Sequence, residues 1–426
     1  MTIDRTKQPP LNIIEKPEFL KPVTNHTGSG NPYFSLCSNN LPVLKLDIMF
    51  PAGSIFDPNP AVGVATANLL TTGTKLLSAA QIAEIIDFHG ASVSLSVSKK
   101  YVIITVSFLP KQAVKIFDLL SQILDEPTFP QTEIDLFVNK SIRQLQINME
   151  KVSYLASRQF NKMLFSENHA FGKSVSIDDY KKLKSKQLYD FFIRHYKQQK
   201  PIILITGDID KTITKPLEDF IDKLGTTKSV SEAVPTLDIP AMPVSKECLQ
   251  KEGVQSAIRF GKLTINKFHP DYFKLIFTNT LFGGYFGSRL IKNIREEKGY
   301  TYGIYAHLSS FMETGYFYVS ADVGSNYGKA TIQEVEKEIK LLQDHLVPSD
   351  EMERVKNYLS GILLQKFDGV FAISDAFLEL KKFDLDWNYY VILSDTIKYI
   401  TPDEVNNMAK QYFNINEMSS LIVGQC

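Results

Sequence analysis

The sequence lacks the features that would place the protein on a membrane or a nucleic acid. Its 47 acidic and 47 basic side chains cancel, so there is no basic excess of the kind that binds phosphate backbones or anionic lipids. It has no run of about 18 apolar residues, which argues against a membrane-spanning helix. Residues 1–21 are polar and proline-rich rather than apolar, so a secretory signal peptide is not expected. We therefore expect a cytoplasmic protein with neither nucleic acid nor membrane as a partner.

Residues that bind transition metals are also scarce. The three cysteines (Cys37, Cys248 and Cys426) are far apart and odd in number, which is typical of free thiols in a reducing cytoplasm and excludes a zinc site built from cysteine pairs. No two of the seven histidines lie within one helical turn of each other, and none belongs to an H-x-x-E-H or H-E-x-x-H motif. The histidines are therefore interpreted as isolated surface or interface residues.

An internal repeat divides the chain into two halves. Segments recur in the same order at an offset of 217 or 218 residues: 101–106 with 318–323, 129–133 with 347–351, and 202–207 with 419–424. A solenoid unit would be far shorter, at roughly 20–50 residues. The repeat predicts two homologous domains, and the composition predicts their limits: an N-terminal extension at 1–29, a first domain at 30–220, a linker rich in Ser, Thr and Pro at 221–246, and a second domain at 247–426.

Each half mixes strands and helices without regular alternation. Apolar and polar side chains alternate over 44–50, as they do in a half-buried strand. Ser78 and Gln81 form a capping box that predicts the start of a helix, and 92–109 is typical of a β-hairpin with Lys99 and Lys100 at its turn. This pattern favours an α+β fold with two duplicated domains, each an antiparallel-rich sheet with helices packed on one face.

A series of short motifs resembles a known family. The motifs are Pro51-Ala-Gly-Ser54, an apolar helical segment at 61–74 that ends in Gly-Thr, 167–172 (Glu-Asn-His-Ala-Phe-Gly), 281–284 (Leu-Phe-Gly-Gly) and 294–302 (Ile-Arg-Glu-Glu-Lys-Gly-Tyr-Thr-Tyr). In this order, and together with the repeat, they resemble the pitrilysin/insulinase family of zinc metallopeptidases over roughly residues 42–424. The chain looks most like the short, two-domain bacterial subunits of that family, which work in pairs.

The resemblance also points to a zinc helix without its ligands. In family enzymes, the helix that matches 61–74 carries H-x-x-E-H, two zinc ligands and a general base. The matching residues here are Val64, Ala67 and Asn68. Valine and alanine cannot bind a metal, and a neutral amide oxygen is a poor ligand for zinc. The interpretation is that apolar packing has replaced coordination.

The third zinc ligand of the family, a glutamate on a later helix, is also missing. It aligns with Gln144, and a shift of one residue would give Arg143 or Leu145, none of which is a carboxylate. We therefore expect this chain to bind no cofactor and no metal, with zinc held by a partner subunit.

An arginine–tyrosine pair of the family is present. Its pattern R-E-x-x-G-x-x-Y matches Arg295 to Tyr302, and in the family this pair comes from the C-terminal domain and faces the zinc. The resemblance implies that Arg295 binds a substrate carbonyl or carboxylate and that the phenol of Tyr302 stabilises the oxyanion. The structural alternative is that Arg295 pairs with Glu296, Glu297 or a partner across the sheet, and that Tyr302 simply packs.

Two functions remain open. The first is the zinc-less subunit of a heterodimeric metallopeptidase, inactive alone, whose partners are a homologous subunit with an intact zinc motif and a peptide substrate. The second is a non-enzymatic structural or peptide-binding protein, like the core subunits of respiratory complexes. Retention of Arg295 and Tyr302 favours the first. The isolated chain could form homodimers.

Overall fold

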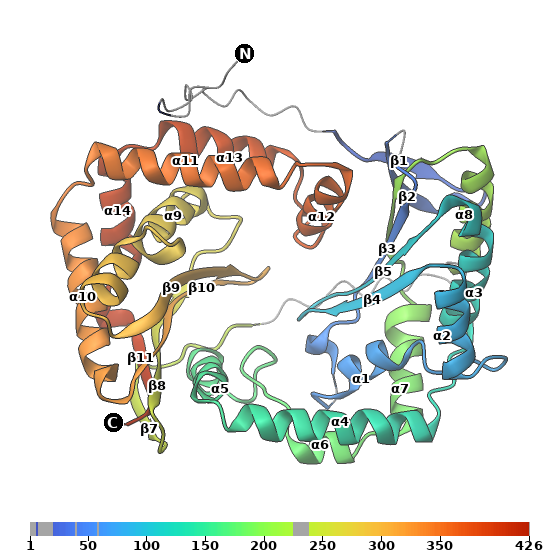
Figure 1. Ribbon diagram of the computed structural model, residues 1–426, viewed down its shortest axis with the longest axis horizontal. Helices are drawn as coiled ribbons and strands as arrows, with labels where there is room; N and C mark the ends of the chain where they lie inside the picture. Colours follow the sequence, from blue (N-terminus) through green and yellow to red (C-terminus); the bar gives the residue numbers. More distant parts are fainter. Residues whose placement is uncertain (1–5, 7–19, 39–40, 58, 225–237, 426) are drawn as a thin grey trace.

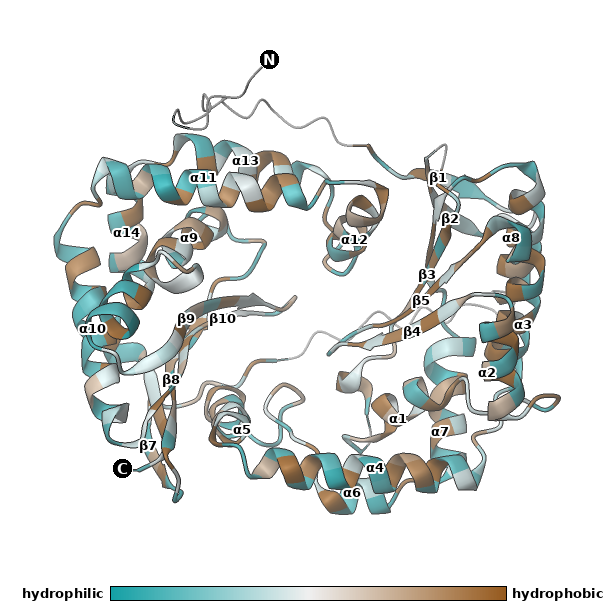
Figure 2. Ribbon diagram, in the orientation of Figure 1, coloured by the Kyte–Doolittle hydropathy of each residue, from teal (hydrophilic) through white to brown (hydrophobic). Residues whose placement is uncertain are grey.

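The computed structural model describes residues 6, 20–38, 41–57, 59–224 and 238–425. They form two α+β halves, each a sheet with helices packed against it, on opposite sides of the molecule (Figure 1). Hydrophobic residues predominate along the strands β3 (Leu44–Phe50) and β5 (Val102–Phe108), whereas α10 (Gly328–Asp344) and α11 (Ser349–Gln365) carry many hydrophilic residues (Figure 2). Among the described helices, none combines the length and apolar character that crossing a bilayer requires.

The N-terminal half is built on a six-stranded sheet. Its other strands are β1 (Val23–His26), β2 (Pro32–Cys37), β4 (Ser92–Val97) and β6 (Ile202–Gly207). The strand order is β1-β2-β6-β3-β5-β4, and all neighbours are antiparallel except β2 and β6. The predicted hairpin is confirmed as β4 and β5. Strand β1 lies inside the segment 1–29, so this sheet starts ahead of residue 30.

The C-terminal half repeats this arrangement with five strands. They are β7 (Lys246–Gln250), β8 (Gln255–Thr264), β9 (Thr301–Ser310), β10 (Gly315–Gly324) and β11 (Ser419–Gly424). The order is β7-β11-β8-β10-β9, with one parallel pair, β7 and β11, in the place of β2 and β6. The duplication predicted from the sequence is therefore confirmed. Most of the expected linker, residues 225–237, lies outside the described residues.

The helices follow the same repeat. In the N-terminal half they are α1 (Val62–Leu69), α2 (Ala79–Phe88), α3 (Ala113–Asp125), α4 (Gln131–Met149), α5 (Val152–Phe165), α6 (Ile177–Lys181), α7 (Ser185–Phe192) and α8 (Lys211–Leu224). The C-terminal half adds α9 (Tyr272–Asn279), α12 (Val370–Lys381), α13 (Asn388–Tyr399) and α14 (Pro402–Tyr412) to α10 and α11. Shorter 3-10 and π turns include η3 (Ile193–Lys197), η4 (Thr280–Gly284) and η5 (Ile291–Glu297). The predicted capping box of Ser78 and Gln81 opens α2.

One helix of each half packs on the sheet of the other half. The N-terminal helix α5 lies against β8 and β11 of the C-terminal sheet, in a buried cluster that includes Ala156, Phe160, Ala257, Leu421 and Val423. Its repeat equivalent α12 lies against β2 and β6 of the N-terminal sheet, in a cluster that includes Leu36, Met49, Leu204, Ile373 and Phe377. The two halves are thus joined by a reciprocal exchange of helices.

This exchange corrects the expectation that residues 44–50 form a half-buried strand. Leu46 and Ile48 of β3 face the helices of their own half, as predicted. Met49 faces the opposite side of the sheet and is 1% exposed because α12 covers that side, and Asp47 is likewise 1% exposed. The alternation of apolar and polar side chains does predict the strand β3. The face of β3 that carries Asp47 and Met49, however, is covered by α12 and not by water.

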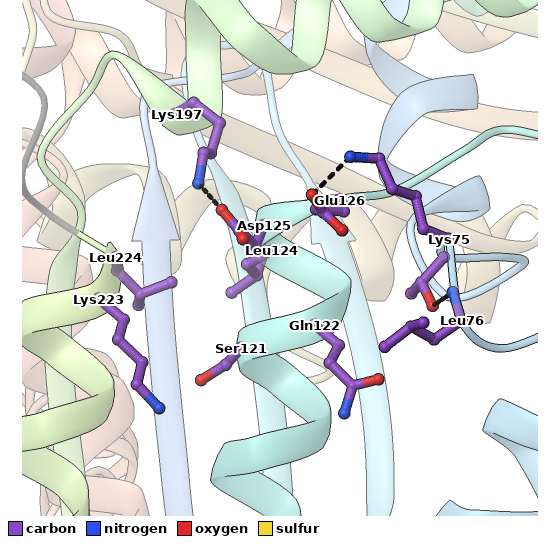
Figure 3. Close-up of a pocket in the computed structure, with 11 residues that line it drawn as sticks. Lys75, Leu76, Ser121, Gln122, Leu124, Asp125, Glu126, Lys197, Lys223 and Leu224 are labelled. Carbon is purple, nitrogen blue, oxygen red and sulfur yellow. Dashed lines mark hydrogen bonds and ion pairs between the residues drawn. The ribbon is translucent and has the colours of Figure 1, made fainter.

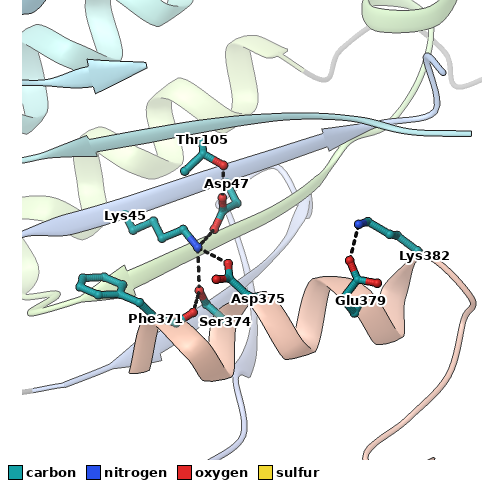
Figure 4. A network of polar contacts seen from close by, with 8 residues as sticks. All are labelled: Lys45, Asp47, Thr105, Phe371, Ser374, Asp375, Glu379 and Lys382. Atoms are coloured by element: carbon teal, nitrogen blue, oxygen red, sulfur yellow. Dashed lines mark hydrogen bonds and ion pairs between the residues drawn. The ribbon is translucent and has the colours of Figure 1, made fainter. Parts of the chain in front are cut away.

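A polar network fastens α12 to the N-terminal sheet (Figure 4). The ammonium group of Lys45 on β3 lies 3.3 Å from Asp47 and 3.1 Å from the hydroxyl of Ser374 on α12, and it also pairs with Asp375. Asp47 accepts a 2.6 Å hydrogen bond from Thr105 on β5. Burial raises the pKa of Asp47, and the charge of Lys45 opposes that rise. The buried carboxyl is therefore supported by a cation and a hydroxyl group.

The other exchanged helix is held by a similar contact. Arg259 on β8 is 7% exposed and donates hydrogen bonds to the hydroxyl of Ser157 on α5, at 3.0 Å, and to the carbonyl of Ser153, at 3.1 Å. Ser157 and Ser374 are equivalent positions of the repeat, 217 residues apart. Each exchanged helix thus presents one serine to a cation on the sheet that it covers.

The tips of two hairpins also meet between the halves. Lys100, between β4 and β5, forms a 2.5 Å ion pair with Glu313, between β9 and β10. Their side chains are 9% and 3% exposed, so this pair is buried. Removing one partner of a buried pair leaves an uncompensated charge and typically costs about 3–5 kcal/mol. The contact therefore fixes the two hairpin tips against each other.

The cysteines differ from the expected three free thiols. Cys37 is a free, exposed thiol. Cys248 on β7 is disulfide-bonded, which corrects the expectation for that residue, and Cys426 lies outside the described residues. Because disulfides persist mainly in oxidising compartments, cysteine usage no longer favours a reducing cytoplasm. A cytoplasmic location stays a prediction.

The helix exchange makes a prediction about stability. Phe160 on α5 is 2% exposed in the cluster between the halves, so Phe160→Ala should lower the free energy of unfolding by about 3–5 kcal/mol. Chemical denaturation followed by circular dichroism measures this loss. Leu136→Ala, at a position 64% exposed, is the matched control and should change stability by less than about 0.5 kcal/mol. A Phe160 variant as stable as this control would contradict the assignment.

Candidate functional site

Helix α1 lies where the resemblance places a zinc helix. Ala67 is completely buried in the N-terminal core and Val64 is partly buried, so both act as packing residues. Asn68 is exposed, and its side-chain amide donates a 2.8 Å hydrogen bond back to the carbonyl of Val64. Two apolar side chains and one amide turned back along its own helix do not form a metal-binding face.

The third expected ligand position is equally unsuited to zinc. Gln144 is exposed on α4, which packs against α1, and its amide donates a 3.1 Å hydrogen bond to Asn148 one turn later. Of the neighbours that a shifted alignment would select, Arg143 is exposed and Leu145 is buried. Across the described ranges, no group of three His, Cys, Asp or Glu side chains is arranged to hold a metal. The residues present therefore do not fit zinc.

A buried carboxyl at the start of α1 was missed by sequence reasoning. Asp57 accepts a 2.6 Å hydrogen bond from the backbone N–H of Gly63 and so caps this helix. Burial raises the pKa of Asp57 to about 7, although the bond from Gly63 and the charges of Lys173 and Lys99 oppose the rise. Burial raises the pKa of the Tyr196 phenol, and the negative charge of Asp57 raises it further. The sequence signal was an Asp a few residues ahead of an apolar helix.

The guanidinium of Arg295 lies over an aromatic ring. Arg295 sits on η5, partly buried, with its guanidinium carbon 4.4 Å from the ring centre of Phe286. Within the part of the chain that the structure describes, no carboxylate lies at ion-pair distance from Arg295. The alternative that Arg295 pairs with Glu296 or Glu297 is therefore wrong. Sequence reasoning missed Phe286 because its contact with Arg295 is set by the tertiary fold and leaves no local pattern.

Tyr302 projects into solvent. It lies at the start of β9, the edge strand of the C-terminal sheet, and its side chain is 91% exposed. The alternative that Tyr302 simply packs is therefore wrong. Arg295 and Tyr302 make no hydrogen bond with each other in the described residues, and their elements η5 and β9 belong to the C-terminal half, whereas α1 belongs to the N-terminal half.

His169 has the structural role expected of an isolated histidine. Its Nδ1 accepts a 3.2 Å hydrogen bond from the backbone N–H of Phe171, and its ring stacks on Phe165 with the ring centres 6.1 Å apart. Burial lowers the pKa of His169, which favours the neutral ring that can accept this bond. It stabilises the turn after α5.

A pocket of about 560 Å³ lies at the end of α3 but has no catalytic character. Two of its lysines are engaged by acidic neighbours, with Lys75 2.6 Å from Glu126 and Lys197 2.5 Å from Asp125 (Figure 3). The remaining lining combines Lys223 with polar and aliphatic side chains. These pairs are partly exposed and lend the pocket little binding energy. The pocket is therefore not assigned to the candidate site.

Comparison with known families matches both halves of the chain. Residues 37–172 match the family described as Insulinase (Peptidase family M16), and residues 182–359 match the family described as Peptidase M16 inactive domain. The two matches follow one another along the chain and cover most of both halves.

The chain is also similar to several bacterial proteins. It is 22% identical to the Uncharacterized zinc protease YmxG of Bacillus subtilis, over 82% of this chain and 85% of that protein. It is 24% identical to the Non-peptidase homolog YmxG of Helicobacter pylori, over 90% and 89%. A crystal structure of a peptidase M16 inactive domain from Pseudomonas fluorescens superposes with a TM-score of 0.86 at 20% identity, over 96% of this chain and 99% of that one.

A human protein supplies a further comparison. Mitochondrial-processing peptidase subunit beta is 21% identical, over 78% of this chain and 70% of that protein. Its name identifies it as one subunit of an assembly.

The erased ligand set predicts that the purified protein contains no stoichiometric zinc. Elemental analysis of protein dialysed against micromolar zinc should find well under one zinc per chain, because Val64, Ala67 and Gln144 offer no ligand. A double variant that restores histidine at Val64 and Asn68 is the positive comparison and should take up more zinc. One tightly held zinc in the wild-type chain would refute the assignment of these positions.

The raised pKa of Asp57 predicts a pH-dependent stability. The folded state holds the proton more tightly than the unfolded chain, so this contribution is fully present below about pH 4 and is lost as pH rises through about 7. Asp57→Asn can still accept from Gly63 but does not titrate. The unfolding free energy of the wild type should therefore fall relative to this variant between pH 4 and 7, by at most about 1.4 kcal/mol per pH unit. Parallel pH profiles would contradict the prediction.

Proposed function

Because this chain belongs to the insulinase family of M16 peptidases but carries none of the family's zinc ligands, we propose that it is the zinc-less subunit of a two-chain metallopeptidase. The proposed partner is a homologous chain with an intact H-x-x-E-H motif, and the proposed substrate is a peptide. Alone, the chain would be inactive. The similarity to Mitochondrial-processing peptidase subunit beta supports a paired arrangement.

The observation that carries this proposal is the state of the arginine–tyrosine pair. Tyr302 is 91% exposed on an open sheet edge, and Arg295 has no carboxylate partner in the described residues. Tyr302 is therefore not buried, and Arg295, which is partly buried against the ring of Phe286, forms no ion pair in the described residues. Both side chains match a family motif, and neither contributes much to the stability of the fold. This supports a role in binding another molecule.

The chemistry of the pair suits a peptide bond under attack. The guanidinium of Arg295 presents several N–H donors in one plane, which match a carbonyl or a terminal carboxylate of the peptide. The phenol of Tyr302 can donate to the oxygen that becomes negative when water adds to the carbonyl. Zinc in the partner would activate that water. This chain would thus hold the peptide and stabilise charge, and the partner would supply the nucleophile.

A non-enzymatic role is the second candidate. One relative is named a non-peptidase homolog, and in the described residues α1 belongs to no group of three His, Cys, Asp or Glu side chains that could hold a metal. In that case the exposed pair would bind a peptide without cleaving it, or would have no ligand. The two candidates differ in whether a zinc-bearing partner gains activity when this chain is added.

We expect reconstitution to show which candidate holds. The chain, mixed with a homologous chain that carries an intact H-x-x-E-H motif, should cleave a quenched-fluorescence peptide library that neither chain cleaves alone. Arg295→Ala and Tyr302→Phe should each lower turnover by on the order of 10²–10³, because each removes a transition-state donor. Complex formation, followed by analytical ultracentrifugation, should be unchanged.

Two control variants test whether a loss of turnover is specific to Arg295 and Tyr302. Arg194→Ala and Tyr399→Phe remove an exposed arginine and an exposed phenol outside the pair and should leave turnover unchanged. If the complex forms and both Arg295 and Tyr302 variants turn over at the wild-type rate, the pair is not catalytic and the non-enzymatic role takes precedence.

A further inference from the structure

We propose that Phe286 and Thr301 are positioning residues, which hold Arg295 and Tyr302 in a fixed orientation toward their ligand. The inference rests on the function proposed above for the pair. It adds the two side chains that support the pair: Phe286 lies outside the arginine–tyrosine motif, and Thr301 occupies a variable position within it.

Phe286 has no evident role in the core. It lies between η4 and η5 and is 59% exposed, an unfavourable position for a large apolar ring. Among the described residues, the recorded partner of this ring is the guanidinium of Arg295, 4.4 Å away. Cation–π stacking covers one face of the guanidinium and leaves the N–H donors around its edge available. The ring therefore orients the group without competing for the donors that would bind a carboxylate or carbonyl.

Thr301 holds a β-bulge that orients Tyr302. Ile304 pairs with Ala321 and Thr301 pairs with Val323, so Tyr302 and Gly303 together face the single intervening residue of β10. The extra residue breaks the alternation of side chains along an edge strand and directs one of them away from the sheet. Tyr302 is that residue, which accounts for its 91% exposure.

The hydroxyl of Thr301 makes two polar contacts at the bulge, one with β10 and one within β9. It lies 2.6 Å from the carbonyl oxygen of Asp322 on β10 and accepts a 3.1 Å hydrogen bond from the N–H of Gly303. The hydroxyl therefore links the two strands at the irregular position. Valine has nearly the same shape but no hydroxyl, so it would lose both contacts.

The chain between the two supports is also fixed. Gly299 adopts a φ of 68°, in the left-handed region, and turns the chain from η5 into β9. Tyr300 then donates a 3.0 Å backbone hydrogen bond to Ile294, and its ring stacks on Tyr327 with the ring centres 4.4 Å apart. Arg295 and Tyr302 thus lie on either side of a turn that these contacts fix. Phe286 contacts the first side chain, and Thr301 holds the bulge that carries the second.

The test compares variants that keep or remove each support in the reconstituted complex, with the quenched-fluorescence peptide as substrate. Phe286→Leu removes the ring and Phe286→Tyr keeps it; Thr301→Val removes the hydroxyl and Thr301→Ser keeps it. Phe286→Leu should raise KM by about tenfold, because an unsupported guanidinium must be ordered on binding. Thr301→Val should lower kcat by about tenfold, because a misaligned donor acts in the transition state. The tyrosine and serine variants should restore wild-type kinetics.

A second measurement needs only this chain. Phenylglyoxal modifies accessible guanidinium groups, and mass spectrometry resolves the rate at each arginine. Phe286→Leu should speed the modification of Arg295 several-fold relative to both wild type and Phe286→Tyr, while the exposed Arg194 reacts at an unchanged rate. Equal rates at Arg295 in the leucine and tyrosine variants would overturn the role of Phe286.

The outcomes separate this inference from the proposed function. If Arg295→Ala and Tyr302→Phe impair cleavage while Phe286→Leu and Thr301→Val behave as wild type, the positioning role is refuted and the proposed function stands. If Arg295→Ala and Tyr302→Phe have no effect, both fail. If all four impair cleavage and the conservative variants restore it, both are supported.

Discussion

Each sheet of this protein is completed by a helix from the opposite half, and the rest of the structure depends on this exchange. Helices α5 and α12 cover the faces that the sheets' own helices leave open, through the clusters around Phe160 and Phe377. Because a buried face cannot separate without exposing its apolar surface, the two halves behave as one body. The exchange also sets where the hairpin tips meet, and so makes the buried pair of Lys100 and Glu313 possible.

The two sets of residues that align with functional positions of the family differ in their surroundings in this chain. On α1, Ala67 is buried in the core and the side chain of Asn68 donates a hydrogen bond to a carbonyl of the same helix. These positions therefore contribute to the stability of the fold. Arg295 and Tyr302 remain at the surface, where they contribute little to folding. Selection for stability alone would not keep an exposed phenol on an edge strand. The contrast supports a role for the second pair outside this chain.

The sequence predicted the features that depend on neighbouring residues. The capping box at Ser78, the hairpin of β4 and β5 and the repeat all have local signals, namely a polar cap, a strict alternation and a constant offset. The exchange of α5 and α12 has none, because an apolar helical face shows that it is buried but not which sheet covers it. For the same reason, Asp47 was expected in solvent. The stacking of Phe286 on Arg295 depends on a tertiary contact, which spacing alone does not determine.

The exchange of α5 and α12 also bears on how the internal repeat arose. A single ancestral unit with this arrangement would have had one sheet face uncovered and one helix without a sheet. It could bury both only by trading helices with a second copy of itself. The repeat therefore matches the arrangement of a domain-swapped homodimer within one polypeptide, in which Ser157 and Ser374, 217 residues apart, each contact a cation on the sheet that their helix covers.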